Sequence, residues 1–278
     1  MLLLACLALG VGRAAASEEV VTLGGLEVYV WAPDAASMTR LPVILFSHGF
    51  HGCATQSRFL MRAFAGAGFL VFAPNHRDAT CAGGGAHWTE RSAVPFKDSA
   101  AWSDSSYVDR SEDMQRLVRA IGTDARYSAR ADLARIGLAG HSLGGYTALG
   151  LAGAWPAWRM PRVEAVLALS PYVQPFLMQH TLGGVDLPTM LQGGTLDFGI
   201  TPTLHKSMGA YDDLRPPKYY IEFKGASHFA WTDLGRVAHD SIVVYSVAFM
   251  KRYVKGDVAE DLVLREQRAD VDVLRTAP

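Results

Sequence analysis

Residues 135–146 read RIGLAGHSLGGY, an apolar run that passes through Gly140-His141-Ser142-Leu143-Gly144 into a stretch with helical patterning. The spacing G-x-S-x-G between a strand and a helix is typical of a sharp turn that lifts a serine side chain above the edge of a sheet. Glycine on both sides of the serine lets the strand and the helix pack closely. The pattern therefore predicts that Ser142 is a nucleophile. The alternative is a glycine-rich turn in which the serine only caps a helix.

A nucleophilic serine needs a base beside it and a third group that orients the base. Downstream of Ser142, Asp197 and His228 each follow an apolar run that has the character of a strand. Open α/β sheets place their sites at the carboxyl ends of strands, and the chain order serine, acid, histidine is that of the α/β-hydrolase fold. We expect His228 to be the base and Asp197 to orient it. Other acids and histidines fit strand ends less well, namely Asp186, Asp212, Asp213, Asp233, His180, His205 and His239.

The tetrahedral intermediate of acyl transfer carries an oxyanion that requires two hydrogen-bond donors. The backbone N–H of Leu143, directly after the nucleophile, is the first candidate. The second should come from the loop after an earlier strand, where His48-Gly49-Phe50 follows an apolar run. We expect the N–H of Phe50 to be this donor and His48 to brace the loop.

Apolar, β-branched runs alternate with helical patterns along the whole chain, which predicts an α/β fold. Several runs are apolar at every position, as in parallel strands covered on both faces. We therefore expect an α/β-hydrolase fold with a mostly parallel central sheet and helices on both faces. The expected strands are Glu27–Trp31, Pro42–Phe46, Phe69–Ala73, Arg135–Ala139, Val163–Leu169, Thr189–Gln192 and Lys218–Phe223; the expected helices are Ser57–Gly66, Ser111–Ile121, Leu143–Ala154, Thr203–Leu214 and Asp240–Tyr253.

Two connections bear on access to Ser142. The segment from Ser170 to Leu187 is too short for a separate lid domain, whereas the segment from Asp78 to Tyr107 is long and rich in aromatic residues. Long loops are often functional. We expect an open cleft in which Trp88, Trp102 or Trp231, together with Phe50, contacts the substrate; the alternative is that these rings cover the protein's own core.

The first residues have the composition of a signal peptide, with an apolar run up to Gly12 and three alanines at 14–16. The run is too short to span a bilayer. We expect residues 1–16 to be a signal, residues 17–278 to form a single catalytic domain, and the mature protein to be secreted or periplasmic. In an oxidising compartment Cys53 and Cys81 would form a disulfide; two separate buried thiols are the alternative.

Composition narrows the possible partners. Half of the residues are hydrophobic, about a fifth are charged, and the formal net charge is −1. No basic tract indicates nucleic acid, no other apolar run predicts stable membrane insertion, and no histidine spacing indicates a metal site. The sequence leaves the oligomeric state open.

Taken together, the chain resembles the dienelactone-hydrolase-like α/β hydrolases, near bacterial cutinase-type polyester hydrolases and platelet-activating-factor acetylhydrolases. The stretches that carry the resemblance are Pro42–Phe50, Gly66–Pro74, Arg135–Tyr146, Leu191–Pro202, Tyr219–Phe229 and Val247–Tyr253. The resemblance implies ester hydrolysis without a cofactor, with Phe50 and Leu143 as oxyanion donors. Dienelactone hydrolases proper use a cysteine where this chain has Ser142, so dienelactone itself is not the expected substrate.

We therefore expect a secreted serine carboxylic-ester hydrolase that forms an acyl-enzyme and acts on a small-molecule or polymeric ester. An amidase, peptidase or thioesterase with the same three residues remains an alternative, as does a non-catalytic binding protein of the same fold. The acyl chain and the alcohol of the substrate are left open by the sequence.

Overall fold

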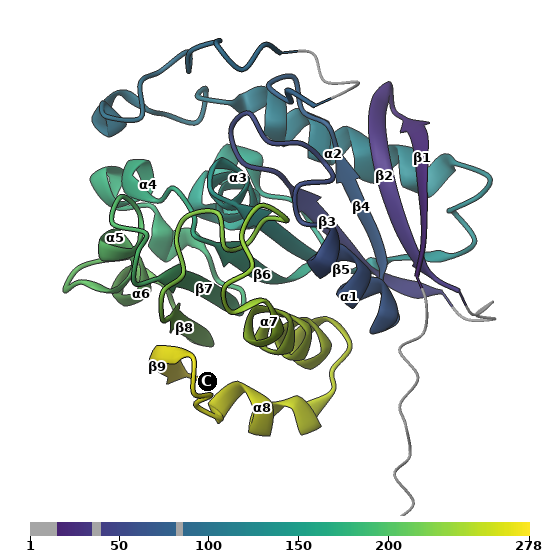
Figure 1. Ribbon diagram of the computed structural model, residues 1–278. Helices are drawn as coiled ribbons and strands as arrows, with labels where there is room; N and C mark the ends of the chain where they lie inside the picture. Colours follow the sequence, from purple (N-terminus) through teal and green to yellow (C-terminus); the bar gives the residue numbers. More distant parts are fainter. Residues whose placement is uncertain (1–15, 35–39, 82–85) are drawn as a thin grey trace, which may run out of the picture.

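The computed structural model describes residues 16–34, 40–81 and 86–278 (Figure 1). The expected signal lies almost wholly outside these residues; only Ala16 is described, and it is the first residue of strand β1.

The centre of the molecule is a nine-stranded sheet with the order β1-β2-β4-β3-β5-β6-β7-β8-β9. The six strands from β4 to β8 in this order pair in parallel, and the pairs β1–β2, β2–β4 and β8–β9 are antiparallel. The mostly parallel sheet confirms the expected fold class. The strands are β1 (Ala16–Leu23), β2 (Leu26–Pro33), β3 (Leu41–Ser47), β4 (Leu70–Pro74), β5 (Ala131–His141), β6 (Val163–Leu169), β7 (Thr189–Gly194), β8 (Lys218–Phe223) and β9 (Val271–Ala277).

Helices cover both faces of the sheet, which explains why the central strands are apolar at every position. Successive side chains of a strand point to opposite faces. In β3, Val43 and Leu45 therefore join the core under α2 to α6, whereas Ile44 and Phe46 join the core under α1, α7 and α8 (Figure 1). The helices are α1 (Arg58–Gly66), α2 (Val108–Thr123), α3 (Leu143–Leu149), α4 (Gln174–Gln179), α5 (Thr201–His205), α6 (Ala210–Asp213), α7 (His239–Val254) and α8 (Asp261–Arg265).

The order in which strands are added to the sheet reverses between β3 and β5. After β3 the chain turns outward to β4, and it then crosses back to form β5 on the other side of β3. The loops after β3 and β5 therefore diverge at the carboxyl edge of the sheet. In open α/β sheets this is where a crevice for ligands opens.

The structure differs from the predicted elements mainly at the edges of the sheet. The edge strands β1 and β9 and the short helices α4 and α8 were not predicted. The single helix expected over Thr203–Leu214 is divided into α5 and α6. Gly209 lies in the break, and its backbone runs so close to its neighbours that a Cβ atom there would lie 2.7 Å from the carbonyl oxygen of Lys206.

The connection from Ser170 to Leu187 contains only α4 and the 3-10 turn Leu182–Gly184, so no lid domain is inserted there. Among the described residues, none of the helices is both long and apolar enough to cross a membrane.

Candidate active site

Ser142 occupies the sharp turn between β5 and α3. Its φ of 56° and ψ of −117° lie in a region that residues other than glycine rarely adopt. The flanking glycines make this turn possible. A Cβ atom on Gly140 would lie 2.1 Å from the carbonyl oxygen of Gly144, and one on Gly144 would lie 1.9 Å from the carbonyl oxygen of Ser47. The turn is thus held by backbone contacts that only glycine permits.

The three residues predicted to act together lie in one hydrogen-bonded chain. His228 Nε2 lies 3.0 Å from Ser142 Oγ, and His228 Nδ1 lies 3.1 Å from Asp197 Oδ2. Each residue follows a different parallel strand, namely β5, β7 and β8. Asp197 is buried, whereas Ser142 and His228 are half-buried and line a cleft.

The partners of the imidazole determine which nitrogen carries the proton. An ionised carboxylate can only accept hydrogen bonds, so the Nδ1 atom beside Asp197 is the protonated one. Nε2 is then free to accept the proton of the Ser142 hydroxyl. The arrangement has the polarity that a serine nucleophile requires.

Ser170, which directly follows β6, joins this group and was not predicted. Its hydroxyl donates to Asp197 Oδ2 and lies 2.9 Å from His228 Nδ1. The sequence around Ser170 contains no recognisable motif. Its place in the site is apparent only from its distances to Asp197 and His228 in the structure.

The loop after β3 lies against Ser142. A Cβ atom on Gly49 would approach to 3.4 Å from Ser142 Cβ, which shows how closely the backbone passes. Phe50 follows in this loop and lines the cleft, and Leu143 begins α3 directly after Ser142. Of the two residues predicted to supply oxyanion donors, Leu143 thus adjoins Ser142 in the chain, and Phe50 lines the same cleft.

A buried arginine braces this loop from beneath. Arg110 of α2 donates to the carbonyl oxygens of His48 (2.6 Å) and Gly49 (3.3 Å), and it forms two bonds with Asp78 (3.1 and 2.7 Å). Burial by itself would raise the pKa of Asp78, but the charge of Arg110 outweighs it and lowers that pKa. His48 Nδ1 donates to the carbonyl oxygen of Gly49 (2.7 Å), so His48 also fixes the loop.

His141, directly before Ser142, connects the loop after β3 with the loop after β8. Its Nε2 donates to the carbonyl oxygen of His228 (2.8 Å), and its Nδ1 accepts from Gln56 Nε2 (3.1 Å). Gln56 Oε1 in turn accepts the backbone N–H of Gly49 (3.0 Å). Burial lowers the pKa of His141 to about 3, so this imidazole stays neutral. Neither Gln56 nor this use of His141 was predicted.

A cleft of about 940 Å³ opens above Ser142. Its apolar wall comes from aromatic and aliphatic side chains of several loops, and the half-buried Ser142 and His228 also line it. The apolar residues are Phe50, Phe96, Tyr172, Ile200, Phe229 and Leu234.

The tryptophans expected to contact the substrate do not line this cleft. Trp102 and Trp231 are fully buried in the two cores, where Trp231 Nε1 donates to Gln192 (2.9 Å). Trp88 is 78% exposed and lies away from the cleft. The long connection does supply one aromatic ring, Phe96, which packs on Phe50 at 5.4 Å between centroids. The structure thus places Phe50 and one aromatic residue of the long connection at the cleft, as expected, and none of the three tryptophans.

The expected disulfide is absent, because Cys53 and Cys81 are both free thiols. Each sulfur faces a polar neighbour: Cys53 Sγ lies 3.6 Å from Thr55 Oγ1, and Cys81 Sγ lies 3.8 Å from Asn75 Oδ1. Burial and a hydrogen bond with Cys53 raise the pKa of Cys81, so this thiol stays protonated at neutral pH.

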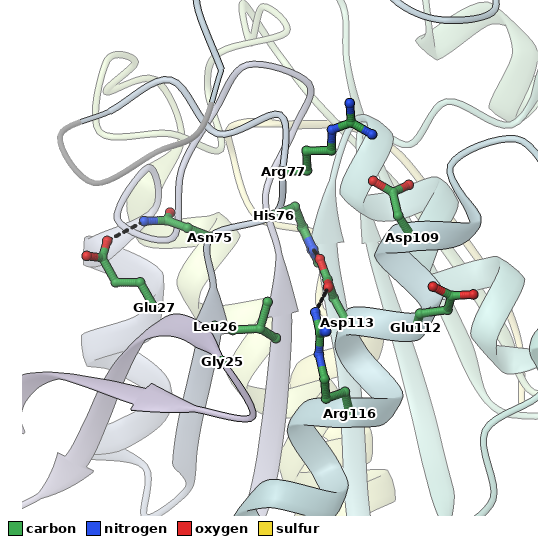
Figure 2. A pocket seen from close by; sticks show the side chains of 10 residues that line it. All are labelled: Gly25, Leu26, Glu27, Asn75, His76, Arg77, Asp109, Glu112, Asp113 and Arg116. Carbon is green, nitrogen blue, oxygen red and sulfur yellow. Dashed lines mark hydrogen bonds and ion pairs between the residues drawn. The ribbon is translucent and has the colours of Figure 1, made fainter.

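A second pocket, of about 400 Å³, lies between the start of β2, the end of β4 and α2 (Figure 2). At its floor His76 Nδ1 pairs with Asp113 Oδ2 (3.0 Å), and His76 Nε2 lies 2.9 Å from Ser47 Oγ. This is again a serine–histidine–aspartate chain, but Ser47 is fully buried and does not line the pocket. We interpret the chain as structural support for the end of β3. Within the described residues, no cluster of three or more histidines, cysteines or acids could hold a metal ion.

The sheet order, the strained serine turn and the hydrogen-bonded chain at the carboxyl edge define an α/β hydrolase with a candidate Ser-His-Asp site. A family model described as PET hydrolase-like matches residues 101–273, more than half of the chain, and the chain belongs to this family. The model of platelet-activating factor acetylhydrolase, isoform II, matches residues 19–120. These matches confirm the resemblance seen in the sequence.

Curated relatives include cutinases. Cutinase est2 of Thermobifida alba is 33% identical over 139 residues, which are 49% of this chain and 42% of the relative. Cutinase 2 of Thermobifida cellulosilytica is 33% identical over 131 residues (46% and 45%). Bis(hydroxyethyl) terephthalate hydrolase of Streptomyces coelicolor is 27% identical over 130 residues (46% and 37%). The aligned region thus spans less than half the length of these relatives.

Proposed function

We propose that this protein is a serine carboxylic-ester hydrolase with Ser142 as nucleophile, His228 as general base and acid, and Asp197 as the group that orients His228. The observation that carries the proposal is the hydrogen-bonded chain from Ser142 through His228 to buried Asp197, with the serine opening into an apolar cleft. A binding protein of this fold would need neither the chain nor the strained serine.

The proposed reaction has two halves. Ser142 Oγ attacks the ester carbonyl while its proton passes to His228 Nε2, and the N–H groups of Phe50 and Leu143 donate to the oxyanion. His228 then gives that proton to the departing alkoxide, which leaves as the alcohol, and an acyl-enzyme remains. Water attacks the acyl carbon, His228 Nε2 takes the proton of the water and returns it to Ser142, and the acid is released.

The cleft favours an ester with a large apolar or aromatic part. Phe50, Phe96 and Tyr172 form a cluster in which the Phe96–Tyr172 centroids are 5.0 Å apart. Rigid rings provide apolar contact at low entropic cost. The names of the relatives, cutinase and bis(hydroxyethyl) terephthalate hydrolase, support aromatic or polymeric esters as substrates.

We further propose that residues 1–16 are a signal for export and that residues 17–278 form the catalytic domain. The composition of the first residues supports this proposal.

The test is hydrolysis of p-nitrophenyl esters of increasing acyl length, beside bis(hydroxyethyl) terephthalate, a p-nitroanilide and a thioester. We expect turnover of the oxygen esters that Ser142→Ala abolishes. Turnover of only the anilide or only the thioester would replace the proposal by the amidase or the thioesterase. No turnover of any of them would favour a binding protein.

A further inference from the structure

Ser170 is held rigidly at the carboxyl end of β6. It is fully buried, and its backbone N–H donates to the carbonyl oxygen of Gln192 in β7 (2.8 Å). Its φ of 42° is unusual for a residue other than glycine. The next residue, Pro171, packs against the nucleophile turn, where a Cβ atom on Gly145 would lie 2.6 Å from Pro171 Cβ. The hydroxyl of Ser170 is therefore placed by both the sheet and the turn.

The direction of each hydrogen bond follows from what the groups can donate. A hydroxyl has one proton and can also accept, whereas the Asp197 carboxylate only accepts. Ser170 therefore gives its proton to Asp197 Oδ2, and its oxygen accepts from His228 Nδ1 at 2.9 Å. Because Asp197 Oδ2 is itself 3.1 Å from the same Nδ1, the Nδ1 proton is shared between two acceptors.

Within the described residues, Ser170 is one of only two side chains that hydrogen-bond to the Asp197 carboxylate; the other is His228. Asp197 is only 5% exposed, so water cannot readily replace a lost donor. When a buried carboxylate loses a hydrogen-bond donor, the folded state is destabilised and the carboxylate is held less firmly in its orientation. Removal of the Ser170 hydroxyl should therefore act on His228 through Asp197 as well as directly.

We propose that Ser170 is a positioning residue for ester hydrolysis, because its hydroxyl holds the Asp197 carboxylate and keeps the proton of His228 on Nδ1. This inference rests on the function proposed above. It assigns to Ser170 no contact with the substrate, so its effect is on kcat and on the titration of the site.

In the part of the chain that the structure describes, the following polar and titratable groups lie against the His228 ring. Asp197 and the Ser170 hydroxyl lie beside Nδ1, and Ser142 lies beside Nε2. The ring of His141 lies 4.8 Å away between centroids, and burial keeps that imidazole neutral by lowering its pKa to about 3. The Ser170 hydroxyl donates to the Asp197 carboxylate and accepts from His228 Nδ1, so its loss alters both hydrogen bonds that fix the Nδ1 proton. The pH–rate profile should therefore change when this hydroxyl is removed.

The experiment compares Ser170→Ala with wild type and with Ser246→Ala. Ser246 is equally buried and accepts a hydrogen bond from the side chain of Gln192 (3.0 Å); within the described residues its side chain has no hydrogen bond to Ser142, His228 or Asp197. We expect Ser170→Ala to lower kcat by about ten-fold, to change KM by less than about two-fold, and to alter the pH–rate profile. Ser246→Ala should lower thermal stability and leave the pH profile unchanged. Ser170→Thr, which keeps the hydroxyl, should restore the profile even though its branched side chain is strained at positive φ.

A double variant separates positioning from packing. If Ser170 acts through Asp197, Ser170→Ala should cost clearly less in Asp197→Asn protein than in wild type, because coupled residues are not additive. If the loss of kcat in the double variant equals the product of the two single losses, the proposal is overturned. A Ser170→Ala enzyme with the kcat and pH profile of wild type would overturn it as well.

Spectra of ¹⁵N-labelled histidine give the tautomer of His228 independently of turnover. We expect the Nδ1–H form in wild type and a mixture in Ser170→Ala, and an unchanged tautomer in the variant would also count against it. If the wild-type protein hydrolyses no ester, the proposed function is refuted, whereas the tautomer spectra still test the role of Ser170.

Discussion

At the scale of single residues, the site depends on the protonation of one imidazole. In the proposed mechanism, Asp197 keeps the proton on His228 Nδ1 and stabilises the imidazolium that forms when Ser142 is deprotonated. Its carboxylate is buried between strand ends, with Ser170 as an additional donor. An amide in its place can offer a donor to Nδ1 and so favour the wrong tautomer.

Asp197→Asn should therefore reduce kcat by about 10³- to 10⁴-fold with little change in the fold. Steady-state kinetics on a p-nitrophenyl ester and a circular dichroism melt measure the two effects. Asp186→Asn is the matched control, because Asp186 is exposed and pairs with Arg159 on the surface. Activity of Asp197→Asn within ten-fold of wild type would mean that another acid orients His228.

Much at this scale could be predicted from the sequence, and the reason is chemical. Ser142 lies in a motif whose glycines are dictated by backbone contact, and Asp197 and His228 follow apolar strands in a known order. Ser170 has no such signal, because its role arises from distances between strands β6, β7 and β8. Trp102 and Trp231 lie in the cores and not at the cleft, and the sequence could not show this because their size suits a core as well as a cleft.

At the scale of elements, the serine turn and the loop after β3 are built against each other. The backbone of Gly144 faces the carbonyl oxygen of Ser47, the last residue of β3. The two elements that carry Leu143 and Phe50 therefore share one tight contact, and their spacing is fixed by the absence of a side chain.

Gly144→Ala should destabilise the protein by more than about 4 kcal/mol or prevent folding, because its Cβ atom would overlap backbone atoms that cannot move independently. Gly199→Ala is the control, since a Cβ atom there meets nothing within 4 Å. Urea unfolding of both variants makes the comparison. Equal stability of the two would show that the turn is looser than described.

The loop after β3 also depends on Arg110 of α2. The guanidinium reaches two carbonyl oxygens of the loop and Asp78 at the same time, a geometry that a lysine ammonium cannot reproduce.

We expect Arg110→Lys to lower kcat by about ten-fold or more with a smaller change in KM, because the loop that carries the Phe50 N–H is no longer fixed. Arg116→Lys on the same helix is the control; Arg116 is half-exposed and forms a short-range pair with Asp113. If Arg110→Lys keeps the kcat of wild type, the hydrogen bonds of Arg110 to this loop are not needed for turnover.

The strands and helices of the centre could be predicted because they are apolar on both faces or have clear helical periodicity. The edge strands could not. In β1 the stretch Ser17-Glu18-Glu19 is polar and largely exposed, and β9 has only one fully buried residue, Val271. Such segments become strands through pairing with a neighbour and not through their own hydrophobic pattern.

At the scale of the whole molecule, three buried histidines make the fold sensitive to acid. Burial, together with the charge of Arg110, lowers the pKa values of His48 and His76 well below the ordinary range. Burial also lowers the pKa of His141 to about 3. In the unfolded chain all three titrate near about 6.5. The unfolded state thus binds more protons below that pH, so stability falls as the pH falls.

Below about pH 6 each of these histidines should remove about 1.4 kcal/mol of unfolding free energy per pH unit, or about 4 kcal/mol per unit together. Asp78, whose pKa is lowered in the fold, adds a further loss below about pH 4. Urea unfolding at a series of pH values measures this slope. His76→Asn should reduce this slope by the contribution of one histidine, about 1.4 kcal/mol per pH unit. His87→Asn, at an exposed position, should leave the slope unchanged. A flat stability profile from pH 7 to 5 would contradict the account.

The central claim is that Ser142 is the residue that becomes acylated. Its most direct test is to inactivate the protein with an aryl organophosphate, which transfers a phosphoryl group to an activated serine and releases the phenol, and to locate the adduct by peptide mass spectrometry. The account predicts one adduct per chain, on Ser142, formed in step with the loss of ester turnover and absent from His228→Ala protein. Complete inactivation with Ser142 unmodified, or full labelling of Ser142 with turnover intact, would contradict it.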